Sequence, residues 1–268
     1  MKKPEAVDLH LGQLRVQVLS SDTRLITGLN RLWQGFLGKG SADCRLQVEL
    51  VGEQRSSPWS DQGLTWREGS ACFTALGYEG WIDLRQGEGR LRLSSRFPLE
   101  DVDYFVRVAV AMLAFDAGGV LFHAAGILRG EGVVLFYGPS GAGKTTVARH
   151  SPAGSVLNDD LVLMLPEGNV WMVFATPFWN PTQALPASQQ ARLLALFRLV
   201  QDLRVLARPL TGASSLAAWL ASVPVLTTDP TRNHQLLQLG QRLLGSVPAY
   251  ELHFLPDSSF WAVVDERI

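Results

Sequence analysis

Residues 132–149 read GVVLFYGPSGAGKTTVAR, an apolar run that passes directly into a glycine-rich loop. Residues 138–145 satisfy the pattern G-x-x-x-x-G-K-[ST], and residues 133–137 supply the β-strand that precedes such a loop. Glycines allow the backbone to wrap around phosphate oxygens, and the first amides of the following helix point at the same anion. This stretch therefore predicts a site for a nucleoside triphosphate, which we take to be ATP.

The residues of the loop have separate expected tasks. Lys144 is expected to reach the β- and γ-phosphates, and the Thr145 hydroxyl to ligate Mg²⁺, a cation that prefers oxygen donors. Lysine occurs only at residues 2, 3, 39 and 144. A chance match to the pattern therefore has a probability of about one per cent or less. The expected nucleotide-binding residues are Gly138, Pro139, Ser140, Gly141, Ala142, Gly143, Lys144, Thr145 and Thr146.

The composition is that of an ordinary globular chain without a strong electrostatic field. Of 268 residues, 47% are hydrophobic and 18% are charged, and the formal net charge is -1. This charge gives no support for nucleic acid or an anionic membrane as a partner. Cys44 and Cys72 lack the spacing of a zinc site, and the first residues lack the apolar stretch of a signal peptide. We therefore expect a cytoplasmic protein without a membrane span.

Residues 1–98 are expected to form a small α+β lobe. Apolar and polar residues alternate with period two in several runs, which is typical of half-buried strands. Between the first two runs, residues 23–36 carry apolar side chains at helical spacing. The runs expected to be strands are 7–19, 45–51, 72–78, 81–84 and 90–93.

Residues 99–268 are expected to form the nucleotide-binding domain. An amphipathic helix beginning at Leu99 opens this region, with acidic residues in its first turn. Residues 191–208 mix helical and strand signals, so they remain unassigned. The expected fold class is α/β for the nucleotide-binding domain, and α+β for the chain as a whole. Further strands are expected at 120–128, 132–137, 155–157, 161–165, 170–174 and 250–255, and helices at 216–221 and 231–244.

Two adjacent carboxylates follow the loop at Asp159 and Asp160. Phosphoryl transfer needs a carboxylate that holds Mg²⁺ and, where the acceptor is a hydroxyl, a group that takes its proton. One aspartate can hold the cation while its neighbour acts as the base. Asn-Asp-Asp is also the chemistry of a solvated turn. The phosphate loop upstream favours the catalytic interpretation.

Three segments in this order resemble the HPr kinase/phosphorylase family, including its shorter relatives, and more distantly the phosphoenolpyruvate carboxykinase fold. They are His123-Ala124-Ala125-Gly126, then the strand 132–137 leading into the loop, then Leu157-Asn158-Asp159-Asp160. The similarity extends from His123 to Asp160. It implies a P-loop kinase domain of that type.

The resemblance also implies roles for individual residues. Asp159 would deprotonate the acceptor hydroxyl, Lys144 would bind the phosphates, and His123 would lie close to the γ-phosphate. Thr145 and Asp160 would hold Mg²⁺. Without the resemblance, a histidine between apolar neighbours is more often a core side chain.

Several departures from the family pattern narrow the inference. The helix after the loop is cut short by Ser151-Pro152, and the interval to the acidic pair is about two residues shorter than in the HPr enzymes. The family's downstream metal-binding glutamate has no counterpart, since no glutamate occurs between Glu167 and Glu251, and Asp160 must then carry more of the metal. The glycine-rich segment associated with HPr recognition is also missing, which argues against HPr as the substrate.

The sequence therefore predicts an ATP- and Mg²⁺-dependent kinase that phosphorylates a Ser or Thr hydroxyl of a peptide or protein. Two alternatives remain open: a nucleotide-binding regulatory module that transfers nothing, and a small-molecule kinase. A carboxykinase is disfavoured because its extra metal ligands are not found. Related kinases often assemble, so a homo-oligomer is considered, but no residue pattern indicates a symmetry. Residues 176–181, Thr-Pro-Phe-Trp-Asn-Pro, are expected to form a rigid loop beside the nucleotide or the acceptor, or to belong to the core.

Overall fold

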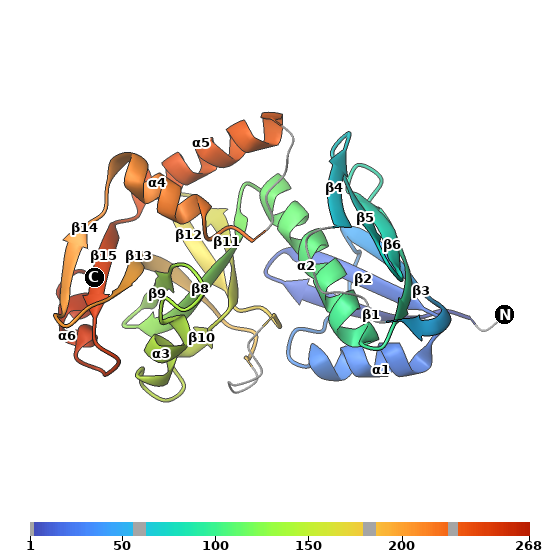
Figure 1. Cartoon of the computed structure of the whole chain (residues 1–268), viewed down its shortest axis with the longest axis horizontal. Helices are drawn as coiled ribbons and strands as arrows, with labels where there is room; N and C mark the ends of the chain where they lie inside the picture. The colour runs from blue at the N-terminus through green and yellow to red at the C-terminus, as the bar shows by residue number, and fades with distance from the viewer. Residues whose placement is uncertain (1–2, 56–62, 179–185, 225–229) are drawn as a thin grey trace. The chain divides into compact units, whose positions relative to one another are not determined.

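The computed structural model describes residues 3–55, 63–178, 186–224 and 230–268 (Figure 1). The chain is a mixed α/β protein with two mixed sheets, each in its own compact unit. Of the described residues, 3–116 and 230–233 belong to the first unit, and the remainder belong to the second. Within these described ranges, none of the helices is both long enough and apolar enough to cross a membrane.

The first unit is built on a seven-stranded sheet in the order β1-β2-β3-β7-β6-β5-β4. Period-two alternation becomes alternating burial, as in β2, where residues 14, 16, 18 and 20 are buried. Helix α1 (Thr23–Leu32) begins where the Asp22 carboxylate accepts a hydrogen bond from the amide of Leu25 at 2.9 Å, a typical N-cap. The strands are β1 (Glu5–Leu11), β2 (Leu14–Ser20), β3 (Cys44–Arg55), β4 (Leu64–Arg67), β5 (Ser70–Ala75), β6 (Tyr78–Asp83) and β7 (Glu88–Ser95).

Two of the expected strands are hairpins instead. Residues 7–19 contain a turn at Gly12 (φ +59°), and residues 72–78 contain one at Gly77 (φ +74°). Both glycines have left-handed backbone angles that other residues adopt at a cost. The buried positions change from odd to even numbers at each turn, from Leu11 to Leu14 and from Phe73 to Tyr78, and this change of phase marks the reversal of direction.

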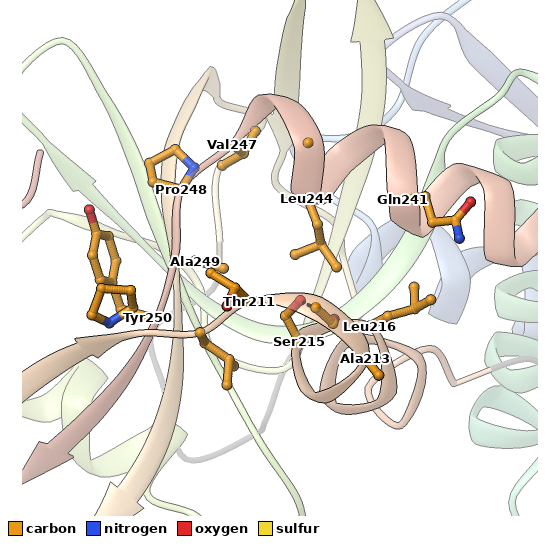
Figure 2. Close-up of a pocket in the computed structure, with 14 residues that line it drawn as sticks. Thr211, Ala213, Ser215, Leu216, Gln241, Leu244, Val247, Pro248, Ala249 and Tyr250 are labelled. Carbon is orange, nitrogen blue, oxygen red and sulfur yellow. Dashed lines mark hydrogen bonds between the residues drawn. The ribbon is translucent and has the colours of Figure 1, made fainter.

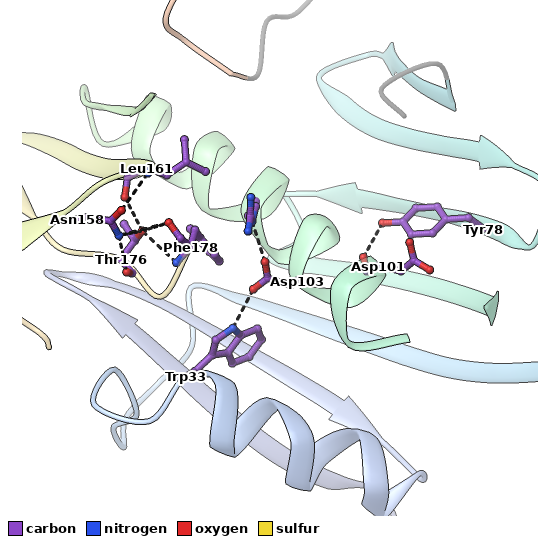
Figure 3. Close-up of polar contacts among 9 residues, drawn as sticks. Trp33, Tyr78, Asp101, Asp103, Asn158, Leu161, Thr176 and Phe178 are labelled. Atoms are coloured by element: carbon purple, nitrogen blue, oxygen red, sulfur yellow. Dashed lines mark hydrogen bonds and ion pairs between the residues drawn. The ribbon is translucent and has the colours of Figure 1, made fainter. Parts of the chain in front are cut away.

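Helix α2 (Pro98–Asp116) belongs to the first unit, which moves the expected boundary from 98/99 to 116/117. The helix packs on α1 and on β2, β3 and β7. Its Asp103 accepts hydrogen bonds from the Trp33 indole at 3.0 Å and from the Arg107 guanidinium at 2.8 Å (Figure 3). The change in the hydrophobic pattern at residue 99 marked the beginning of a helix. The boundary between the two units depends instead on which sheet this helix packs against.

The second unit is built on an eight-stranded sheet that carries the phosphate loop. Strand β9 lies between β8, to which it is antiparallel, and β13, to which it is parallel; β13 is also parallel to β15. The strands are β8 (Val120–Arg129), β9 (Gly132–Tyr137), β10 (Val156–Asn158), β11 (Leu161–Glu167), β12 (Val170–Phe174), β13 (Gln190–Gln201), β14 (Leu206–Pro209) and β15 (Ala249–Phe254). The helices are α3 (Lys144–Arg149), α4 (Gly212–Leu220), α5 (Pro230–Ser246), whose first turn is in the other unit, and α6 (Phe260–Asp265).

This strand order collects several chain segments at one edge of the sheet. Strands β9, β13 and β15 are parallel, so their carboxyl ends lie at the same edge. Strand β8 runs the other way, and its pairing of Ala124 with Tyr137 places His123 at that edge too. Ligands of open α/β sheets bind outside the carboxyl ends of parallel strands.

The unassigned residues 191–208 form strands β13 and β14. Strand β13 is inside the sheet, with β9 on one side and β12 and β15 on the other, and its residues 195–197 are buried in succession. A strand covered on both faces loses its period-two alternation, and its sequence then looks like a buried helix. On one face, Phe136, Phe197, Phe254 and Phe260 form a core with residues of α3 and α6.

Candidate functional site

The glycine-rich loop leaves β9 at Gly138 and enters α3 at Lys144, as the sequence predicts. Three of its glycines have positive φ: +154° at Gly138, +79° at Gly141 and +112° at Gly143. A Cβ on Gly143 would also lie 2.5 Å from the Phe254 ring. Position 143 therefore requires glycine both for its backbone angle and for its contact with the core.

Lys144 is held inside the curve of the loop. Its ammonium donates hydrogen bonds to the carbonyls of Gly138 at 2.9 Å and Pro139 at 3.3 Å, and the residue is only 7% exposed. Burial lowers the pKa of this amine, and the negative charge of Asp160 acts in the opposite direction. An anion that enters the loop would therefore meet a cation that is already in place.

His123 and Asp160, both singled out in the sequence, lie within hydrogen-bond distance of each other. The His123 Nε2 lies 3.1 Å from the Asp160 Oδ1, and both side chains are about one-third exposed, at 37% and 30%. Strand pairing produces this contact, because Leu161 is opposite His123 and the amide of Ala124 donates to the Asp160 carbonyl at 3.0 Å. The pair therefore lies at the sheet edge where β9 ends.

Asp159 and Asp160 are in different environments although they are adjacent. Asp159 is only 3% exposed, whereas the side chain of Asp160 is 30% exposed and faces His123. A buried carboxylate and an accessible one can perform different tasks in one site. The turn that contains them is therefore not simply a solvated turn, since one of its two carboxylates is buried.

Sequence reasoning missed a buried polar network that holds this turn. The Asn158 side-chain oxygen accepts from the amides of Asp160 at 2.8 Å and Leu161 at 3.2 Å, and its nitrogen donates to the Thr176 carbonyl at 2.8 Å (Figure 3). The Thr176 hydroxyl donates to the Leu161 carbonyl at 2.6 Å and accepts from the amide of Phe178 at 3.2 Å. Asn158 and Thr176 are 2% and 0% exposed.

The network assigns part of the expected loop 176–181 to the core. Thr176 and Phe178 are fully buried, while residues 179–181 lie outside the described ranges. The asparagine before the acidic pair and the Thr-Pro sequence were the available signals. Neither identifies its partner, because the two residues meet only through the fold.

A cavity of about 710 Å³ borders the loop on its other flank. Thr146 of α3, Gln201 and Asp202 after β13, and Phe254 and Leu255 at the end of β15 line it. The Gln201 side chain donates to the Gly141 carbonyl at 2.8 Å, so this wall is attached to the loop. Apart from Thr146, sequence reasoning did not select these residues.

A second cavity of about 710 Å³ lies away from the glycine-rich loop (Figure 2). It is lined by residues of α4, by the end of α5 and by Val247 to Tyr250 at the beginning of β15. Because β15 is parallel to β9, its beginning lies at the sheet edge opposite to the one where β9 enters the phosphate loop.

The residues of the site fit a magnesium ion shared with a nucleotide. Mg²⁺ is usually bound by one or two carboxylates and by substrate phosphates, with waters completing the octahedron. The accessible Asp160 carboxylate and the Thr145 hydroxyl provide such a set. Over the ranges that the structure describes, no group of three or more His, Cys, Asp or Glu residues could form an all-protein metal cage.

Comparisons with known proteins add no evidence on the function of this site. The chain matches no protein-family model and none of the curated proteins searched.

Proposed function

We propose that this protein is a P-loop kinase that binds ATP and Mg²⁺ at residues 138–146 and transfers the γ-phosphate to a Ser or Thr hydroxyl of a peptide or protein. The supporting observation is that the His123–Asp160 pair lies at the sheet edge from which the loop holding Lys144 emerges. This is the arrangement expected of a shorter relative of the HPr kinase/phosphorylase family, with an acceptor other than HPr.

Each residue has a defined part in the proposed transfer. Lys144 would neutralise the β- and γ-phosphate oxygens, and Thr145 and Asp160 would hold Mg²⁺, which would supply positive charge for the phosphoryl transfer. Asp159 takes the proton of the acceptor hydroxyl. The hydroxyl oxygen attacks the γ-phosphorus, and the bond between this phosphorus and ADP breaks. His123 lies within hydrogen-bond distance of Asp160 and would hold that carboxylate in position as a metal ligand.

The test follows label from γ-³²P-ATP with Mg²⁺, with and without a lysate of the source cells. Wild type should label a discrete acceptor, whereas Asp159→Asn should bind ATP but lose roughly 10²–10⁴-fold in transfer rate. Glu167→Gln is the matched control, because this exposed carboxylate lies at the opposite end of β11. Release of free phosphate with no labelled acceptor would contradict the proposal.

A nucleotide-controlled binding module is the second candidate. It is favoured by the six-residue length of α3 and by the absence of glutamate between Glu167 and Glu251. Tight ATP binding without transfer, unchanged in Asp159→Asn, would support it. A labelled small molecule in place of a labelled protein would indicate a small-molecule kinase.

A further inference from the structure

We infer that the nucleoside of the bound triphosphate occupies the cavity beside Thr146, with its ribose hydroxyls on the Asp202 carboxylate. This inference rests on the proposed nucleotide binding and is independent of the phosphate acceptor. It assigns the direction in which the nucleotide lies across the site and adds a recognition residue that the loop motif does not contain.

The order of the strands determines the direction in which the nucleotide lies across the site. The loop emerges from β9, which has β8 on one side and β13 on the other. The His123–Asp160 pair belongs to the β8 side, because His123 is on β8 and Asp160 directly precedes β11, which pairs with β8. The reacting phosphate must face these groups, so the rest of the nucleotide must leave the loop toward β13 and β15.

The cavity lies on that side and is joined to the loop at three points. Thr146 is part of its wall, Gln201 donates to the Gly141 carbonyl, and the Phe254 ring touches Gly143. Its volume of about 710 Å³ falls within the range of roughly 300–1,000 Å³ that small-molecule pockets occupy. A nucleoside connected to phosphates in the loop can therefore enter it directly.

The cavity combines apolar walls with one fixed carboxylate, as a nucleoside requires. Leu203 at its wall is 89% exposed, so its apolar side chain is available to pack against a base. Leu255 and Pro256 supply further apolar surface for the flat face of a base. Such surface holds a base without distinguishing adenine from guanine.

Asp202 has the geometry of a ribose ligand. Its Oδ2 lies 2.7 Å from the Nδ1 of His253, and its Oδ1 accepts from the amide of Leu203 at 2.6 Å. The other nitrogen of His253 lies 3.0 Å from Glu251, so the ring is fixed between two carboxylates. The hydrogen bond from His253 lowers the pKa of Asp202, which keeps it an acceptor. With 38% of its side chain exposed, the carboxylate has lone pairs left for two sugar hydroxyls.

The experiment compares the Kd values of ATP, 2′,3′-dideoxy-ATP and inorganic tripolyphosphate, each with Mg²⁺, by isothermal titration calorimetry. Wild type should bind ATP on the order of tenfold more tightly than the dideoxy compound, and Asp202→Asn should remove most of this difference. Leu203→Ser should weaken ATP and dideoxy-ATP alike. Neither substitution should change the affinity for tripolyphosphate by more than about twofold, because the phosphates remain in the loop.

Lys144→Ala separates this inference from the proposed function. Loss of ATP and tripolyphosphate binding in Lys144→Ala, with ATP binding unchanged in Asp202→Asn and Leu203→Ser, would overturn the nucleoside site and leave the loop assignment intact. Unchanged binding of both ligands in Lys144→Ala, or no ATP binding by wild type, would overturn both. Thermal melts of each variant confirm that the protein titrated is folded.

Discussion

Replacing Thr176 by valine should destabilise the second unit by more than its size suggests. Valine has nearly the shape of threonine but lacks the hydroxyl, which donates to the Leu161 carbonyl at 2.6 Å and accepts from the amide of Phe178 at 3.2 Å. The site is fully buried, so water cannot replace these bonds. Each of the two buried partners left unsatisfied costs about 1–3 kcal/mol, which gives roughly 2–6 kcal/mol for Thr176→Val.

Thr176→Ser is the matched control because it keeps the hydroxyl and removes one methyl group. Its expected cost is about 1 kcal/mol. For a unit of this size, these free energies correspond to a decrease in Tm of roughly 4–24 °C for valine and roughly 2–4 °C for serine. Differential scanning calorimetry of the full chain measures both decreases. Under the proposed function, the transition of the second unit should be the one that added ATP shifts upward.

The decisive result is which of the two variants has the larger decrease in Tm. If serine destabilises as much as valine, the methyl group and not the hydroxyl stabilises this position. If both variants leave Tm unchanged, the network of Asn158 and Thr176 does not support the turn. We also expect weaker Mg²⁺-dependent ATP binding in Thr176→Val, since Asn158 connects Thr176 to the amide of Asp160.

Gly143→Ala should abolish ATP binding, because a Cβ at this position would lie 2.5 Å from a phenylalanine ring. Gly141→Ala has open space around it and should cost only the backbone strain of about 1–2 kcal/mol. Equal ATP affinities of the two variants in calorimetry would refute the argument from the ring. Cys44 should resist iodoacetamide at pH 8.5, because burial raises its pKa to about 12, and labelling followed by mass spectrometry at the rate of a free thiol would contradict this. Since that folded pKa is above the ordinary value of 9.0, the contribution of the thiol to stability should be complete below about pH 9 and decline as the pH rises toward 12. Arg107→Met should lower the free energy of unfolding by about 3–5 kcal/mol in urea titrations, because the buried Asp103 would lose its cation, and a loss below about 1 kcal/mol would indicate that solvent screens the pair.

The elements near the phosphate loop could be predicted closely because their signals are local. The apolar run at 132–137 is a strand, Lys144 begins a helix, and Gly143 has the backbone angle that only glycine adopts easily. Each of these depends on a few consecutive residues. The two hairpin turns and the boundary between the units were predicted less accurately, since the reversal of a strand and the sheet on which a helix packs depend on partners distant in the sequence.

Strand β13 shows where local signals fail. It belongs to the segment 191–208, which could not be assigned because apolar side chains on both faces of the strand remove the alternation that identifies a strand. Its end carries Gln201 and Asp202, so the cavity beside Thr146 could not be anticipated either. A residue in an unassigned segment has no predicted neighbours.

The sequence by itself determined that a phosphate loop follows a buried strand and that an acidic pair comes next, because glycine angles, lysine charge and carboxylate chemistry belong to residues adjacent in the chain. Only the tertiary structure decided that His123 contacts Asp160, that Thr176 holds the turn before it, and that Asp202 faces the opposite flank of the loop. These contacts depend on strand order and register. Both are determined by burial across the whole sheet, which no short stretch of sequence contains.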